Sequence, residues 1–293
     1  MKAINVDFYR VATPDGQDFR DLLQNIGGRP IEQRNLDLGD YPVRLQSVSP
    51  WNQCQEGEMV RIRMDSLPKK AGLAGVLEEL DLQDDEGLGE ETAFLYHHPT
   101  RILSIQRNRF GISASGLAWY VKEKAGLDRP IVLEPVLETA VLQRLDEVRF
   151  VRKLEITLAG LGTGTPLRNR GYGVGDIVRL SETFNAPKIA VELSMGRERR
   201  GTLLVERAIG ALRSLAGLVA ENVNEVQKLE VTGITDGDER VVLDLIEERM
   251  KEGVMVPDEG RTVSYEARRG ALREVWSKRV DELRTRFARA ERQ

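Results

Sequence analysis

The sequence predicts an α+β fold. A mixed sheet is expected in the N-terminal half, and strands and helices in a C-terminal half that ends in a long basic amphipathic helix. Alternating apolar and polar residues, typical of half-buried strands, occur in both halves of the 293 residues. Segments with apolar residues three or four positions apart, typical of helices, lie among them. We expect two closely packed halves, residues 1–147 and 148–293.

The most informative segment is a predicted hairpin that leads into a helix. Residues 93–96 and 102–105 alternate between apolar and polar side chains, and the His-His-Pro-Thr sequence at 97–100 separates them. This pattern predicts two strands and a short turn. Residues 112–125 have a buried helical stripe, and Gly126 is the expected end of that helix.

Side chains around this hairpin are expected to differ in exposure. Phe94 should be buried in the strand, whereas Arg107 and Arg109 should be exposed beyond the second strand. Residues 78–91 contain eight acidic residues and neither lysine nor arginine, which is typical of a solvated loop.

The same two periodicities assign the rest of the chain. Alternation bounded by turn residues predicts strands at 5–11, 41–48, 59–64, 131–133, 148–158, 188–195, 228–232 and 241–245. The strand at 188–195 is expected to be buried and central. Helical spacing predicts helices that begin at 18–23 and end at Gly27-Gly28, and helices at 139–145, 176–184, 203–220 and 265–290.

Two glycine- and arginine-containing loops are candidate anion sites, because glycine lets backbone N–H groups turn toward an anion and arginine binds phosphate with two hydrogen bonds. Residues 160–173 contain Arg168 and Arg170, but lack both the P-loop and the dinucleotide-binding patterns. A mobile connection without a ligand is the alternative. The second loop, residues 196–201, precedes a helix and contains Arg197, Arg199 and Arg200.

The terminal helix combines an apolar seam with a basic face. The seam is formed by Leu272, Trp276, Val280, Leu283 and Phe287. It must be covered either by the chain's own body or by a second copy, and we expect self-association through it. The other face contains Arg268, Arg269, Arg273, Lys278, Arg279, Arg284, Arg286 and Arg289, which indicates either a solvated surface or a nucleic-acid-facing helix.

The residue inventory limits the chemistry that this chain can perform. It has one cysteine, Cys54, and two histidines, His97 and His98, too few for a Cys/His zinc site or an HNH nuclease site. A thiol nucleophile at Cys54 would need one of those histidines beside it. We expect neither a metal nor a cofactor. The single cysteine and the absence of an apolar run long enough to span a bilayer predict a cytoplasmic protein without membrane insertion.

A metal-dependent nuclease remains an alternative. The Glu-x-Lys element of restriction-like nucleases does not occur in the sequence. Asp176, Glu192 and Asp244 could still converge as a carboxylate cluster that holds a divalent cation.

The run FLYHHPTRILSIQRNRFGISASGLAWYV resembles a segment of an uncharacterised bacterial family found near phage-defence genes. The later run KLEVTGITDGDERVVLDLIEERM is similar to the C-terminal portion of that family. The order of strands and helices more loosely resembles the B component of Kiwa-type defence pairs. This resemblance implies DNA association and larger assemblies, and the matching positions are Arg107, Asn108, Arg109 and the Asp236-Gly237 turn.

These observations favour a non-catalytic component of an antiphage defence system that binds nucleic acid or a protein partner. DNA or RNA, a second copy of the chain and another defence protein are the expected partners. The alternatives are a divalent-metal-dependent nuclease or phosphodiesterase, and an assembly subunit that does not bind nucleic acid. A net charge of −4 shows no overall nucleic-acid footprint, so any anion site must be local.

Overall fold

The computed structural model describes residues 1–37, 41–159, 173–198, 201–218, 226–257, 260 and 262–287. The chain forms two compact units. Unit 1 comprises Met1–Asp7, Val11–Ile131 and Lys251–Gln293, and unit 2 comprises Phe8–Arg10 and Val132–Met250. This arrangement differs from a division at residue 147, because the final strand and helix return to unit 1 to pair with the first strand and to cover its sheet.

The large sheet of unit 1 is built in the order β14-β1-β8-β7-β4-β3-β2. The bounds of its strands are β1 Lys2–Ala12, β2 Leu36–Asp37, β3 Pro42–Trp51, β4 Cys54–Arg63, β7 Leu88–His97, β8 Ile102–Gln106 and β14 Lys251–Val256. Neighbouring strands along this path are antiparallel, and β9 (Val132–Pro135) also pairs with β1. Strands β1 and β8 are also antiparallel. The N–H of Val11 bonds to the carbonyl of Arg101 near one end of the pair, and the N–H of Arg107 bonds to the carbonyl of Asn5 near the other.

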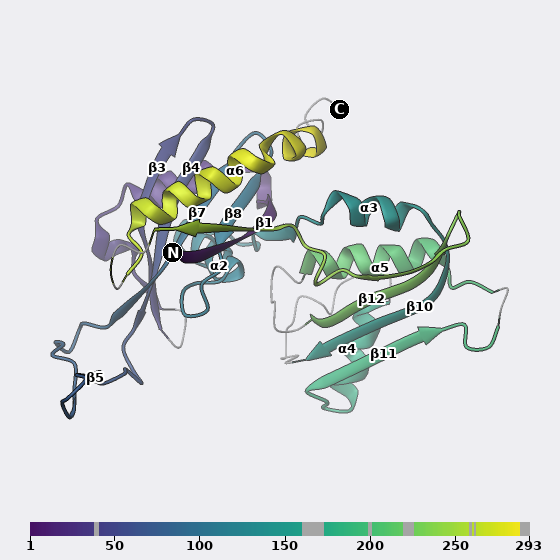
Figure 1. Ribbon diagram of the computed structural model, residues 1–293, viewed down its shortest axis with the longest axis horizontal. Coiled ribbons are helices and arrows are strands. Elements are labelled where there is room, and N and C mark those ends of the chain that lie inside the picture. The colour runs from purple at the N-terminus through teal and green to yellow at the C-terminus, as the bar shows by residue number, and fades with distance from the viewer. Residues whose placement is uncertain are drawn as a thin grey trace. The chain divides into compact units, whose positions relative to one another are not determined.

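Helices cover both faces of the large sheet. On one face, α1 (Phe19–Gly27) packs against β3 and β7, and its Phe19 ring meets the Tyr96 ring edge-on at 5.1 Å. On the other face, α6 (Tyr265–Phe287) lies across β14, β8, β7 and β4 (Figure 1). The consecutive residues Phe94, Leu95 and Tyr96 are consequently all buried, which confirms the expectation for Phe94.

The predicted hairpin and helix of residues 92–125 are confirmed. Strands β7 and β8 pair from Phe94 with Ile105 to His97 with Ile102. Helix α2 (Ala114–Ala125) begins at Ser113, whose hydroxyl accepts the N–H of Gly116. It ends at Gly126 with φ 67°, a conformation that glycine adopts without strain.

The remaining elements of unit 1 are short. They are the 3-10 helices η1 (Pro14–Gly16) and η2 (Ile31–Arg34) and the hairpin of β5 (Lys70–Ala71) and β6 (Leu77–Glu78). This hairpin extends away from the large sheet, and its apolar residues Leu73, Val76 and Leu77 are exposed (Figure 1).

Unit 2 contains a four-stranded antiparallel sheet in the order β11-β10-β12-β13. Its strands are β10 Val148–Ala159, β11 Lys188–Ser194, β12 Val226–Thr235 and β13 Arg240–Asp244, and β9 Val132–Pro135 also belongs to this unit. The helices α3 (Thr139–Asp146), α4 (Val174–Thr183) and α5 (Val205–Leu218) contribute apolar residues to one core with this sheet. The expectation that 188–195 is a buried central strand is wrong: β11 is an edge strand, and its Leu193 is 48% exposed.

The apolar seam of α6 is covered within the chain. Leu272, Trp276 and Leu283 are buried, and the Trp276 ring lies 4.6 Å from the ring of His97 on β7. Val280 and Phe287 are partly buried. The expectation that this seam is available to a second copy is therefore corrected, because its central residues already pack on the large sheet.

Among the described helices, none has the length and apolar character that crossing a bilayer requires.

Candidate anion-binding groove

The strongest candidate site is a groove of about 500 Å³ on unit 2. It is lined mainly by polar and charged side chains from β10, β11 and β12 and from the start of β13: Arg152, Lys153, Glu192, Ser194, Thr232 and Arg240. Three cationic side chains against one carboxylate make this surface positive, although the whole chain has a net charge of −4. Such a surface attracts anions locally.

A β-bulge places two consecutive cationic residues on the groove. The register of β10 against β12 shifts between Val151, which pairs with Gly233, and Lys153, which pairs with Thr232. The extra residue interrupts the alternation of the strand, so that Val151 and Leu154 are buried while Arg152 and Lys153 both line the groove. A regular strand would direct Arg152 and Lys153 to opposite faces.

Arg152 also holds the neighbouring arginine loop against β10. Its guanidinium donates hydrogen bonds to the backbone carbonyls of Glu198 and Gly201. The N–H of Met195 donates to the carbonyl of Arg152 at 3.0 Å, and Leu203 bonds to Val151 after the loop. The loop is thus fixed at both ends, and exposed Arg197 follows Gly196, which lines the groove.

Lysines and glutamates alternate along the open face of the sheet. The Lys153 ammonium lies 3.0 Å from Glu155 and 3.2 Å from Glu192, and Lys228 lies 3.0 Å from Glu155. Hydrogen bonds from Lys153 and Lys228 lower the pKa of Glu155 to about 2. Hydrogen bonds to Glu155 and Glu192 raise the pKa of Lys153 in turn. Both lysines are therefore charged at neutral pH but already have carboxylate partners.

Arg240 lines the groove, and Arg197 directly follows Gly196, which also lines it. Both side chains are exposed, and neither has an ion-pair partner within the described part of the chain. Guanidinium groups of this kind can each bind a phosphate oxygen pair. The arrangement of cationic side chains can bind an anion.

The expected anion-site residues fall into three groups. Arg197 lies beside the groove, as described above. Arg107 is paired with Asp7, whose Oδ2 accepts from its Nε at 2.9 Å, whereas Arg109 is exposed and stacks over Phe110. Arg168, Arg170, Arg199 and Arg200 lie outside the described residues. Arg107 and Arg109 belong to unit 1 and are not among the residues that line the groove.

Of the polar groove residues, sequence reasoning named only Glu192 and missed five: Arg152, Lys153, Ser194, Thr232 and Arg240. The available signal was the pair of adjacent cationic residues inside the otherwise alternating strand of residues 148–158. Two polar residues between apolar ones are typical of a bulge. The positions of Thr232 and Arg240 depend on strand register, which no local pattern contains.

Most of the described cationic side chains of α6 are paired with carboxylates within unit 1. The arginines of this helix pair with carboxylates or, for Arg284, with the amide oxygen of Gln53. Lys278 pairs with Glu274 at 2.8 Å along the helix, and Arg289 lies outside the described residues. This pairing argues against the interpretation of α6 as a nucleic-acid-facing helix.

The candidate catalytic groups do not form an active site. Asp176 pairs with Arg179, Glu192 pairs with Lys153, and Asp244 accepts backbone N–H groups at the end of β13. No group of three potential metal ligands occurs among the described residues.

Cys54 does lie opposite His97 in the register of β4 and β7. Burial raises the pKa of this thiol to about 12, however, and lowers the pKa of His97 to about 4. The thiol is protonated at neutral pH, so this pair lacks the thiolate that nucleophilic catalysis requires.

Comparison with known protein families places the chain in one of them. The model described as "Family of unknown function (DUF6731)" matches residues 1–280, which span both units. The chain belongs to this family. A search of the curated proteins finds no match to the chain.

Proposed function

We propose that the chain is a non-catalytic nucleic-acid-binding component of a bacterial antiphage defence system, and that the groove of unit 2 binds the phosphate backbone. The observation that carries the proposal is the pair of exposed arginines, Arg197 and Arg240, beside a groove whose other cations already have partners. The resemblance of residues 94–121 to a family found near phage-defence genes supplies the biological setting.

Backbone recognition fits this geometry better than base recognition. The groove is lined mainly by charged and polar residues and lies on the face of a sheet, so a strand of nucleic acid could follow it without inserting a helix. Phosphate contacts of this type position a nucleic acid and contribute affinity without sequence preference.

The experiment measures binding of labelled duplex DNA, single-stranded DNA and RNA by fluorescence anisotropy between about 50 and 200 mM salt. An Arg197→Ala, Arg240→Ala double variant should bind more weakly than the native chain. The slope of the logarithm of affinity against the logarithm of salt concentration should fall by roughly 0.9 for each arginine that contacts a duplex phosphate.

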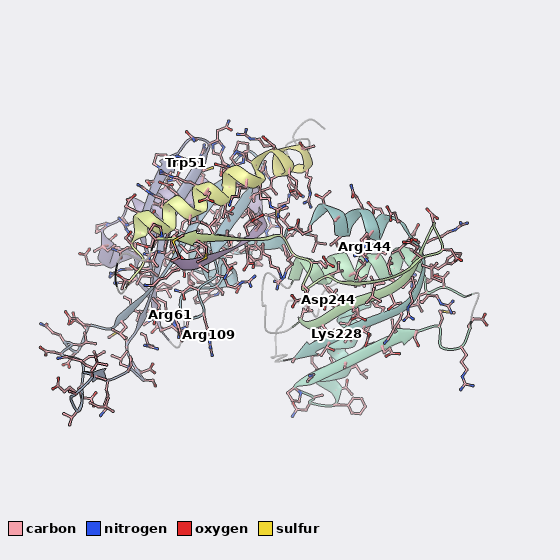
Figure 2. The ribbon with its side chains drawn as sticks, in the orientation of Figure 1. Trp51, Arg61, Arg109, Arg144, Lys228 and Asp244 are labelled. Atoms are coloured by element: carbon pink, nitrogen blue, oxygen red, sulfur yellow. The ribbon has the colours of Figure 1, made fainter. Side chains whose placement is uncertain are left out.

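The matched control is an Arg144→Ala, Arg179→Ala double variant, which removes the same charge from exposed positions on α3 and α4. Arg144 is labelled in Figure 2. It should bind like the native chain. Equal losses in both double variants, or no binding by the native chain, would contradict the proposal.

A second candidate function is protein assembly without nucleic-acid binding. The exposed apolar residues of the β5–β6 hairpin favour it, since the side chain of Leu73 is fully exposed and those of Val76 and Leu77 are mostly exposed. Apolar residues grouped in this way are typical of protein contacts. Absence of salt-dependent nucleic-acid binding together with concentration-dependent light scattering would favour this alternative.

A further inference from the structure

A second polar cavity lies within unit 1, beside the start of α1 and the β7–β8 turn. Its volume is about 310 Å³, which is at the small end of ligand-binding pockets. Three of the residues that line it could contact a ligand: Asp18 at the N-cap of α1, Tyr96 near the end of β7 and Arg101 in the turn. The groove of unit 2 shares none of these residues.

Arg101 has a strained backbone. Its φ is 56°, in the left-handed region that residues other than glycine rarely adopt. Two hydrogen bonds hold it there: its N–H donates to the carbonyl of His98, and its own carbonyl accepts the N–H of Val11 at 2.8 Å. Strained residues cluster at ligand sites, because the surrounding structure must hold them in place.

The side chain of Arg101 does not stabilise the fold through a polar contact with any described residue. It is exposed, lines the cavity and makes no hydrogen bond or ion pair within the described part of the chain. Glycine would adopt this backbone conformation at no cost, so the arginine side chain is not required by the turn. A planar guanidinium group in such a position can bind a carboxylate with two hydrogen bonds.

The hydroxyl of Tyr96 is the second unused group. The residue is only 2% exposed, yet its hydroxyl has no hydrogen-bond partner among the described residues. Burial raises the pKa of Tyr96, the Asp18 carboxylate raises it further, and Arg101 lowers it. The phenol is therefore protonated, and it lies within electrostatic reach of two charged side chains that line the same cavity.

Asp18 supplies the opposite charge. Its Oδ1 accepts the backbone N–H of Arg20 at 2.8 Å, and its Oδ2 lies 3.6 Å from the Arg20 guanidinium. A carboxylate has about four acceptor positions, and this side chain is 34% exposed, so it can still accept hydrogen bonds from a ligand. The cavity thus presents a cation, an anion and a neutral donor.

We propose that this cavity binds a small zwitterion of the free α-amino acid class. The ligand carboxylate bonds to the guanidinium of Arg101 and the hydroxyl of Tyr96, and the ligand ammonium bonds to the carboxylate of Asp18. A simple anion would use Arg101 but would be repelled by Asp18. A simple cation would have the reverse conflict.

The experiment is isothermal titration of the full chain with a panel of free L-α-amino acids. N-acetylglycine, which lacks the ammonium, glycinamide, which lacks the carboxylate, and inorganic phosphate are the comparison probes. At least one free amino acid should bind, and the three comparison probes should not. Binding of phosphate in place of amino acids, or of no probe, would overturn the proposal.

Two variants separate binding from folding. Arg101→Gly removes the guanidinium and relieves the backbone strain, so the melting temperature should stay the same or rise while affinity falls roughly ten- to hundredfold. Tyr96→Phe keeps the ring against Phe19 and removes only the unpaired hydroxyl, so its affinity should fall by up to roughly tenfold at unchanged stability.

Asn52→Gly is the matched control for Arg101→Gly. Asn52 has a φ of 51° in the β3–β4 turn and does not line the cavity, so this change relieves the same kind of strain without removing a ligand contact. Its affinity should equal that of the native chain. Unchanged affinity in Arg101→Gly would show that the cavity is not the amino-acid site.

Discussion

The central strands β4 and β7 of the large sheet in unit 1 are buried on both faces, whereas the four-stranded sheet of unit 2 is buried on one. In β7 the neighbours Phe94 and Leu95 are both fully buried, because α1 covers one face and α6 the other. In β13, Leu243 is fully buried and its neighbour Val242 is 47% exposed. The second sheet therefore keeps a face that a ligand can reach.

The two sheets also differ in whether their ion pairs are buried or exposed. In unit 1, Glu58 on β4 and Arg268 on α6 are both almost fully buried and form an ion pair, and Glu91 also pairs with Arg268 at 2.8 Å. In unit 2, Lys228 pairs with Glu155 and Glu230 on the open face. Buried charges need a partner to be tolerated, whereas exposed charges can exchange a partner for a ligand.

The largest expected effect tests the burial of the two sheets. Phe94→Ala and Leu95→Ala should cost about 3–5 and about 2–5 kcal/mol of unfolding free energy, because both neighbours lose packing in a covered sheet. In β13, Leu243→Ala should cost about 2–5 kcal/mol and Val242→Ala only about 0.5 kcal/mol. Urea denaturation of the four variants measures these losses of unfolding free energy. A loss of unfolding free energy for Leu95→Ala as small as that for Val242→Ala would show that one face of the large sheet is open.

A comparable effect is expected for the buried ion pair. Arg268→Ala leaves the Glu58 carboxylate buried without its partner and should cost about 3–5 kcal/mol of unfolding free energy. Lys228→Ala removes an exposed pair and should cost about 0–1 kcal/mol, which makes it the matched comparison. Similar losses in the two variants, measured by chemical denaturation, would contradict the difference between the two sheets.

The smallest effect is a pH dependence that belongs to unit 1. Burial, with smaller contributions from Arg284 and His98, lowers the pKa of His97 from 6.5 to about 4. Between these values the unfolded chain binds a proton that the folded chain does not, so the free energy of unfolding should decrease as the pH falls through this window.

Urea midpoints of the native chain and a His97→Gln variant, compared at the two ends of that window, measure the effect. The native chain should lose more stability than the variant on acidification. The contribution of Glu155, which is lost between its ordinary pKa of 4.5 and about 2, overlaps the acid end of this window, but it is the same in both chains and cancels in the comparison. Equal pH dependence in both chains would show that His97 is accessible to protons in the folded state.

Four features were predictable from local sequence patterns: the α+β class, the β7–β8 hairpin, the helix that ends at Gly126 and the amphipathic terminal helix. These features depend on periodicity, capping and turn residues, which act over a few positions along the chain. The seam of α6 was equally clear, but local pattern did not determine whether the chain itself or a second copy covers it.

Which charged side chains are paired within the fold and which remain unpaired became clear from the packing of distant segments. Glu58 and Arg268 are 210 positions apart, and pairs of this kind neutralise most of the described cationic side chains of α6. The bulge at Arg152, the edge position of β11 and the cavity beside Arg101 likewise depend on strand register and turn conformation. The physical reason is that a residue's neighbours across a sheet come from distant segments, so its partners follow from packing and not from the adjacent sequence.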